Sequence, residues 1–236
     1  MTRRRWIADE VSGRRAALTG THADHLIRVL RVRVGQEFDV GAGSSVYRAR
    51  VAAIADQRVE FELEEEVVAS SVAQITLVLA IIKFDRMEWA IEKCTEIGVS
   101  RFIPCIAART DTHLAHAAVK RVERWRRIAR EASEQSRRIS PPEIADPAKL
   151  KDVVALSRGT RIFLSESEQI ITLLAALQTQ GKEQELFLVV GPEGGWTDNE
   201  EKLFRDCGWI SASLGPTILR AETAAIVASA IATQVQ

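Results

Sequence analysis

Residues 188–200 read LVVGPEGGWTDNE, and this stretch decides the fold. An apolar run ends in a Gly-Pro-Glu-Gly-Gly loop at 191–195, and Thr197 or Asp198 then begins a helix with two glutamates in its first turn. Thr and Asp are favoured N-cap residues, and acidic side chains stabilise a helix start. The stretch therefore predicts a strand, a glycine-rich loop and a helix, the repeating unit of an α/β sheet.

The same pattern extends along most of the chain, where short apolar runs alternate with segments of helical period. The runs are ITLVLAII (75–82), RFIPCIA (101–107), RIFLS (161–165), LFLVV (186–190) and WISASLG (209–215). Helices are predicted near 84–97, 115–138, 168–178, 198–207 and 221–234. Apolar strands interleaved with helices predict a parallel sheet that is covered on both faces.

The beginning of the chain has a different character. The segment from 37 to 64 predicts short strands, because β-branched and aromatic residues alternate between turn signals, and the glycines at 41 and 43 predict a hairpin turn. We expect two domains, a small β-rich domain at 1–70 and an α/β domain at 71–236.

Positive charge is concentrated although the 236 residues have a formal net charge of +0. Ten arginines fall within the first 50 residues, and Arg28, Arg31 and Arg33 are predicted to face a polyanion. A second basic run, Lys120 to Arg138, lies on a predicted helix, and it is either a solvated face or a phosphate-contacting surface.

Several classes of protein are excluded by composition. No apolar run approaches the roughly 20 residues of a membrane span, and no signal peptide is recognisable at the start, so we expect a cytoplasmic protein. Three widely spaced cysteines predict reduced core thiols and no disulfide framework. The two HxxH pairs lack further ligands, so we expect no metal.

Two loops are candidates for chemistry. The Gly-Pro-Glu-Gly-Gly loop lies where α/β sheets bind ligands, although a purely structural turn is the alternative. It is neither a P-loop nor a dinucleotide-binding loop. Residues 214–223, LGPTILRAET, form the second loop, in which Arg220 either pairs with Glu222 or points into the site as a fixed cation. The apolar helix that follows must be buried in the core or at a subunit interface.

These segments together resemble the RsmE family of the SPOUT superfamily, whose members methylate N3 of a uridine in 16S ribosomal RNA. The family motif HxxHLxxVLRxxxG appears at 22–35, and the stretch EKCTEIGV at 92–99 follows Lys83. The stretch EASEQS appears at 131–136, and GPEGG and LGPTILRAETA are the most specific matches. The chain departs from the usual family pattern at Thr217, often basic, and at Arg137, often glycine.

The resemblance implies a PUA-like β-barrel RNA-binding domain followed by a SPOUT methyltransferase domain with a C-terminal trefoil knot. It also implies a homodimer and a part in ribosome biogenesis, with 16S ribosomal RNA, within the small ribosomal subunit, as substrate. The expected S-adenosylmethionine contacts are Leu164, Glu166, Gly191, Pro192, Glu193, Gly194, Gly195, Leu214, Gly215, Ile218 and Leu219. The resemblance adds Lys83, Arg109, Glu134, Gln135 and Arg138 to the RNA-binding arginines Arg28, Arg31 and Arg33.

Chemistry at uracil N3 requires removal of a proton and stabilisation of charge on the flanking oxygens. Arg220 is the candidate for stabilisation. Glu193, Glu134 and Glu222 are candidate bases, among which the sequence does not choose. Two alternatives remain open: a SPOUT enzyme that methylates another RNA atom, such as a ribose 2′-hydroxyl, and a non-catalytic ribosome-assembly factor.

Overall fold

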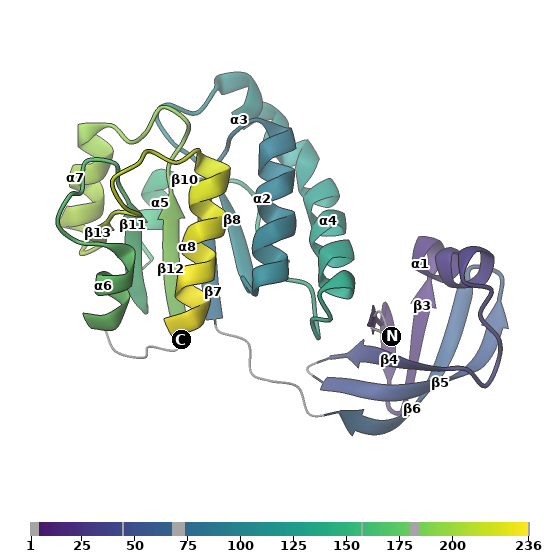
Figure 1. Cartoon of the computed structure of the whole chain (residues 1–236). Coiled ribbons are helices and arrows are strands. Elements are labelled where there is room, and N and C mark those ends of the chain that lie inside the picture. Colours follow the sequence, from purple (N-terminus) through teal and green to yellow (C-terminus); the bar gives the residue numbers. More distant parts are fainter. Residues whose placement is uncertain (1–4, 44, 68–73, 157, 180–184, 236) are drawn as a thin grey trace. The chain divides into compact units, whose positions relative to one another are not determined.

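The computed structural model describes residues 5–43, 45–67, 74–156, 158–179 and 185–235 (Figure 1). The chain divides into two compact units, one of residues 1–71 with 130–141 and one of residues 72–129 with 142–236. The domain boundary predicted between 70 and 71 lies outside the described residues. The segment 130–141, which the predicted domains kept in the second half, groups with the first unit.

The first unit is a six-stranded sheet in the order β1-β4-β5-β6-β3-β2. Its strands are β1 (Trp6–Ile7), β2 (Glu10–Ser12), β3 (Arg15–Thr19), β4 (Glu37–Ala42), β5 (Ser45–Ala55) and β6 (Arg58–Val67). A short helix, α1 (Gly20–Asp24), and a π-helical turn (His25–Val29) follow β3. Trp6, Leu18 and Phe61 are fully buried in its core. The predicted strands between 37 and 64 are confirmed, whereas β1 to β3 are too short for a periodic signal.

The second unit has a parallel sheet, as predicted, in the order β10-β8-β7-β12-β11-β13, with β9 paired to β8. The strands are β7 (Gln74–Ala80), β8 (Arg101–Ile106), β9 (Glu143–Ile144), β10 (Ala148–Lys149), β11 (Thr160–Leu164), β12 (Glu185–Val190) and β13 (Ile210–Ala212). All five predicted apolar runs are strands. The central strand β7 contributes Leu77 to one apolar cluster and Val78 to the other, so both faces are buried.

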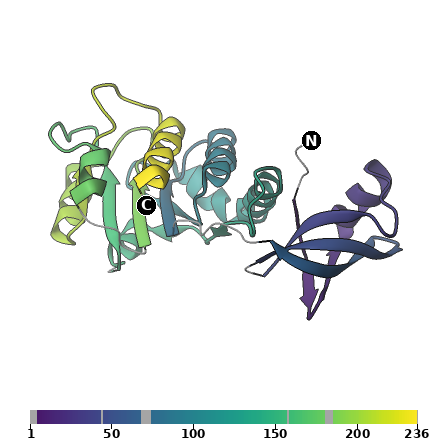
Figure 2. The same cartoon turned by 60° about the horizontal axis from the view of Figure 1, so that its bottom comes forward.

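Helices cover both faces of this sheet (Figures 1 and 2). They are α2 (Phe84–Ile97), α3 (Thr112–Ala118), α4 (Val122–Gln135), α5 (Leu150–Val154), α6 (Leu173–Thr179), α7 (Asp198–Asp206) and α8 (Ala221–Val235). Helices α2, α6 and α8 pack with the start of α4 on one face, and α5 and α7 pack on the other. None of the helices in the described part of the chain has the length and apolar character that a membrane span requires.

Two helices begin or end at residues other than those predicted, because single side chains or backbone conformations set their ends. The segment predicted as one helix at 115–138 is α3, a 3-10 turn (Val119–Arg121) and α4, and α3 begins early because the Asp111 carboxylate caps it. Beyond α4, Arg137 has a φ of +60°, a conformation that favours glycine. The helix predicted at 168–178 begins only at Leu173, because the Glu168 carboxylate accepts the backbone N–H groups of the two following isoleucines.

Candidate active site

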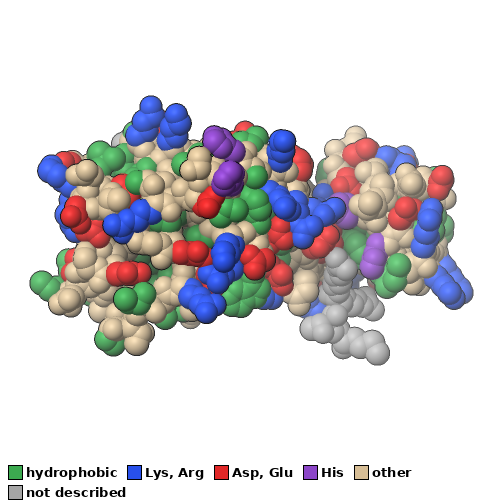
Figure 3. Space-filling view, turned by 90° about the horizontal axis from the view of Figure 1, so that it is seen from above, with side chains coloured by type: hydrophobic (Ala, Val, Ile, Leu, Met, Phe, Trp, Pro, Cys, Tyr) green, Lys and Arg blue, Asp and Glu red, His purple; other side chains and the backbone are tan. Residues whose placement is uncertain are grey.

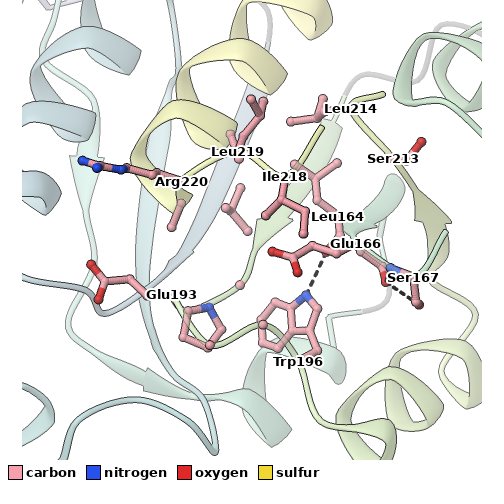
Figure 4. A pocket seen from close by; sticks show the side chains of 18 of the residues that line it. Leu164, Glu166, Ser167, Glu193, Trp196, Ser213, Leu214, Ile218, Leu219 and Arg220 are labelled. Atoms are coloured by element: carbon pink, nitrogen blue, oxygen red, sulfur yellow. Dashed lines mark hydrogen bonds between the residues drawn. The ribbon is translucent and has the colours of Figure 1, made fainter. Parts of the chain in front are cut away.

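A cavity of about 570 Å³ opens at the carboxyl edge of the parallel sheet (Figure 4). Most of its wall comes from three segments: the loop after β11, the Gly-Pro-Glu-Gly-Gly loop after β12 and the loop between β13 and α8. The volume falls within the range of about 300–1,000 Å³ that small-molecule sites occupy. All eleven residues expected to contact the cofactor line this cavity, and Arg109 and Arg220 line it too.

The geometry restricts side chains at all three glycines of the loop, most strongly at Gly191 and Gly195. Gly195 has a φ of +69°, in the left-handed region. A Cβ atom on Gly191 would lie 3.0 Å from Cε2 of Trp196, and one on Gly194 would lie 3.3 Å from Cδ of Arg109. The Arg109 guanidinium donates a hydrogen bond to the Gly194 carbonyl oxygen. The loop backbone is therefore closely packed below and open toward the cavity.

The helix after this loop is fixed by a capping box. The Thr197 hydroxyl accepts the Glu200 backbone N–H, and the Glu200 carboxylate accepts the Thr197 backbone N–H at 2.9 Å, so Thr197 is the N-cap. Glu200 also accepts the backbone N–H of Ala108 at 2.7 Å. The buried Glu200 thus joins the start of α7 to the loop after β8, and both positions are set by one side chain.

A second carboxylate organises the loop after β11. Glu201 accepts hydrogen bonds from the hydroxyls of Ser165 and Ser167, and its other oxygen lies 2.6 Å from Nη2 of Arg205. Burial alone would raise the pKa of Glu201, but the hydrogen bonds from Ser165, Arg205 and Ser167 outweigh it and lower the pKa. Glu201 therefore remains a carboxylate and holds the loop in place.

Three of the four candidate catalytic residues belong to the second unit, where they occupy different environments. Arg220 is exposed at the cavity wall and makes no ion pair within the described residues. Glu193 lines the cavity with a side chain that is 41% exposed, whereas the Glu222 side chain is 6% exposed and does not line it. Figure 4 shows Arg220 and Glu193 on the same side of the view, away from Leu214 and Ile218.

Glu222 pairs with a residue that sequence reasoning missed, rather than with Arg220. Oε1 of Glu222 lies 3.8 Å from Nε of Arg86, and Nη1 of the same guanidinium contacts Oε1 of Glu193. Arg86 lies in the first turn of α2 and lines the cavity. A cation in the first turn of a helix is unfavourable by itself. This unfavourable position is a signal in the sequence that could have pointed to Arg86 as a residue with a partner elsewhere.

The predicted RNA-binding residues are distributed over both units. Arg28, Arg31 and Arg33 are exposed in the first unit, while Lys83 and Arg109 are exposed in the second. Three more belong to the segment that groups with the first unit: exposed Gln135, half-buried Arg138 and Glu134, which is 1% exposed. Burial lowers the pKa of Arg138 to about 10. None of these except Arg109 lines the cavity.

Several members of the basic run from Lys120 to Arg138, which spans the 3-10 turn and α4, contact neighbouring side chains. Arg124 pairs with Glu88 at 2.6 Å, Arg121 lies over the Phe84 ring, and Arg126 contacts Glu123. Lys120 and Arg127 have no such partner among the described residues. Figure 3 shows basic and acidic side chains interspersed over the face seen from above. These contacts favour a solvated face for the paired arginines, and a phosphate-contacting surface at Lys120 and Arg127 stays a prediction.

Among the described residues, no cluster of three or more His, Cys, Asp or Glu side chains could hold a metal ion. The cysteines are free; two are buried in the core, as predicted, and Cys207 is half-buried. His22 places Nδ1 3.2 Å from Oδ1 of Asp9.

Comparison with known proteins identifies the class of this fold and site. The model of an RNA methyltransferase domain matches residues 69–233, and that of an RNA methyltransferase PUA domain matches residues 18–64. The chain is thus an RNA methyltransferase with a PUA domain. These matches bear out the α/β and PUA assignments made from the sequence.

The particular family follows from curated relatives. The chain is 36% identical to ribosomal RNA small subunit methyltransferase E of Synechocystis over 90% of this chain and 71% of the relative. It is 31% identical to the Bacillus subtilis protein of the same name over 93% of this chain and 90% of the relative. The chain belongs to the ribosomal RNA small subunit methyltransferase E family, which confirms the resemblance seen in the motifs.

A solved structure supports the same assignment. The ribosomal RNA small subunit methyltransferase E from Neisseria gonorrhoeae, whose structure was determined bound to S-adenosyl methionine, superposes with a TM-score of 0.85. It is 28% identical in sequence, and the match covers 97% of this chain and 96% of that one.

Proposed function

We propose that this chain transfers the methyl group of S-adenosylmethionine to N3 of a uridine in 16S ribosomal RNA. The single observation that carries the proposal is the cavity at the carboxyl edge of the sheet, because all the residues expected to hold the cofactor line it. The family relatives that are named for small-subunit ribosomal RNA support the substrate class.

The residues present fit the cofactor. Gly194 and Gly195 line the cavity without side chains, so the backbone groups of the loop are accessible to a ligand there. Leu164, Leu214 and Ile218 provide apolar walls that suit an adenine ring, and Glu166 offers a carboxylate that suits hydroxyl or amine groups. When bound, S-adenosylmethionine supplies an activated methyl group, so the protein contributes mainly alignment.

The catalytic roles are assigned to groups that face the cavity. Arg220 stabilises the charge that develops on a uracil oxygen when the N3 proton leaves, because its guanidinium is a permanently charged donor at the cavity wall. Glu193 is better placed than Glu222 to accept that proton, since Glu193 lines the cavity and Glu222 does not. Glu134 is buried in the segment that groups with the first unit, and we assign it no role in proton transfer.

RNA recognition is assigned to the first unit together with the exposed cations near the cavity. Arg31 and Arg33 are exposed and make no ion pair within the described residues, so they are available to phosphates. Arg28 lies 3.4 Å from Asp24 and is partly neutralised. Lys83 and Arg109 are exposed in the second unit, where RNA must approach the cavity.

We also propose the trefoil knot and the homodimer of this superfamily. Support for the knot is that β13 lies at the sheet edge, whereas α8, which follows it, packs against α2 and the central strand β7. Support for the dimer comes from Ile226 and Val227, which stay half-buried on α8, although the rest of this helix is largely covered by its own chain. Sedimentation at micromolar concentration tests the dimer; a monomeric mass with full activity would exclude it.

The methylated atom is tested with ribosomal RNA from a strain that lacks the protein. Digestion and mass spectrometry should show the loss of one 3-methyluridine from 16S RNA, and purified protein with S-adenosylmethionine should restore it. Loss of a 2′-O-methyl group instead would assign the chain to the alternative reaction. Cofactor binding without any lost methyl group would favour an assembly factor.

A further inference from the structure

Arg86 occupies a position that helix stability does not explain. It lies in the first turn of α2, where the helix dipole favours anions and disfavours a cation. Its side chain is only 29% exposed, so desolvation adds to the cost. A cation in this place requires compensating anions, and the structure supplies two of them.

Both anions come from segments of the cavity. Nη1 of Arg86 contacts Oε1 of Glu193 in the Gly-Pro-Glu-Gly-Gly loop, and Nε lies 3.8 Å from Oε1 of Glu222 in the first turn of α8. Glu222 is 6% exposed, and its second oxygen, Oε2, is buried without a hydrogen-bond partner among the described residues. A buried carboxylate in that state depends strongly on a nearby cation. Arg86 is the cation that contacts it.

We propose that Arg86 is a positioning residue for the cofactor: one guanidinium clamps the glycine-rich loop to the start of α8. These are two of the three segments that supply most of the cavity wall, so the clamp sets their separation. The inference rests on the proposed function, in that the cavity is taken to bind S-adenosylmethionine. Arg86 acts through Glu193 and Glu222 and the backbone around them, and its guanidinium itself neither accepts nor donates a proton in the reaction.

Arginine is suited to this task by its shape. Its planar fork presents donors in fixed directions, so it can bind two carboxylates from different segments at once. A lysine ammonium is a point charge on a flexible stem, and it would hold one carboxylate well and the other poorly. Arg86→Lys should therefore recover only part of what Arg86→Met loses.

The test is a double-mutant cycle on cofactor affinity, measured by calorimetric titration of the full chain with S-adenosylmethionine. Arg86→Met should weaken binding about tenfold or more, equivalent to about 1.4 kcal/mol. The Glu222→Gln variant lacks the buried charge. In this background, Arg86→Met should weaken the affinity for S-adenosylmethionine by no more than about threefold. Steady-state kinetics should show the loss in KM for S-adenosylmethionine, with kcat changed much less.

Controls keep the clamp falsifiable. Arg124→Ala breaks another ion pair of α2, with Glu88, away from the cavity, and it should leave cofactor affinity unchanged. If Arg86→Met fails to fold by circular dichroism, Arg86→Lys and the double variant give the comparison. The clamp is overturned if Arg86→Met binds S-adenosylmethionine with wild-type affinity. It is also overturned if Arg86→Met loses the same affinity with and without the Glu222 charge. A wild-type protein that does not bind S-adenosylmethionine overturns the proposed function instead.

Discussion

The indole Nε1 of Trp196 donates a hydrogen bond of 2.8 Å to the Leu164 carbonyl oxygen (Figure 4). Leu164 ends β11, and Trp196 directly follows the glycine-rich loop after β12, so this bond ties together two neighbouring loops at the sheet edge. The same ring lies 3.0 Å from where a Cβ on Gly191 would be. The Trp196 side chain thus supports the glycine-rich loop, whose backbone faces the cavity.

The first prediction concerns the backbone of this loop. Gly195→Val should weaken S-adenosylmethionine binding by more than tenfold, because a β-branched residue at a φ of +69° costs about 1–2 kcal/mol and moves the loop. Isothermal calorimetry measures the affinity. Gly13→Val is the matched control, since Gly13 has a similar φ of +57° in the turn between β2 and β3. Equal losses in both variants, or none in either, would place the cofactor elsewhere.

The second prediction assigns Arg220 to the transition state. Arg220→Ala should leave the affinities for S-adenosylmethionine and RNA nearly unchanged while single-turnover methyl transfer falls by about 10²- to 10³-fold. A quenched assay with tritiated cofactor, at saturating RNA, measures the rate. Stability should not change much, because the exposed side chain makes no ion pair within the described residues. A rate within threefold of wild type would remove Arg220 from the chemistry.

The strands and most helices of the second unit could be predicted because their signals are local. The buried strands appear as apolar runs, and the capping box of α7 is contained within four residues, Thr197 to Glu200. The same locality explains why the two loops that line the cavity could be predicted. Each loop is formed by consecutive residues after a strand, and the parallel sheet brings the carboxyl ends of its strands to one edge.

Other features could not be predicted because they depend on distant partners or on single side chains. Arg86 and Glu193 are 107 positions apart, and nothing in either segment indicates the other. The late start of α6 depends on the Glu168 carboxylate, which competes with the helix for two backbone N–H groups. The proposal of Glu193 rather than Glu222 as proton acceptor depends on burial and on the cavity lining, which their neighbouring sequence does not show.

The third prediction concerns thiol reactivity. Burial raises the pKa of Cys94 and of Cys105 to about 12 in each case, so neither forms a thiolate at pH 8. At this pH, Ellman's reagent should therefore react rapidly with at most one thiol of the native protein, that of Cys207. All three should react in guanidinium. Rapid modification of two or more thiols in the native protein would contradict the packing of this core.

The fourth prediction follows from the lowered pKa of Glu201. A carboxylate with a lowered folded-state pKa stabilises the protein above its unfolded value of about 4.3, and this contribution is lost as pH falls through the folded value. Glu201→Gln should lower the free energy of unfolding by about 1–2 kcal/mol at pH 7. The difference from wild type should shrink below about pH 4 in urea titrations. Asp206→Asn, which breaks an exposed pair with Lys202 on the same helix, should have little effect at either pH.

The last prediction separates RNA binding from cofactor binding and decides between two basic surfaces. Arg31 and Arg33 are exposed in the first unit without ion pairs to described residues, and Lys120 and Arg127 are their counterparts in the second unit. Each phosphate contact that is lost should reduce the slope of log affinity against log salt by about 0.7–0.9. The double reversal Arg31→Glu with Arg33→Glu should therefore weaken RNA binding and flatten its salt dependence, with cofactor affinity unchanged. Lys120→Glu with Arg127→Glu changes the net charge equally, so it is the matched control, and filter binding across a salt series measures both. If only the second pair flattens the slope, the basic helix contacts RNA and the first unit does not.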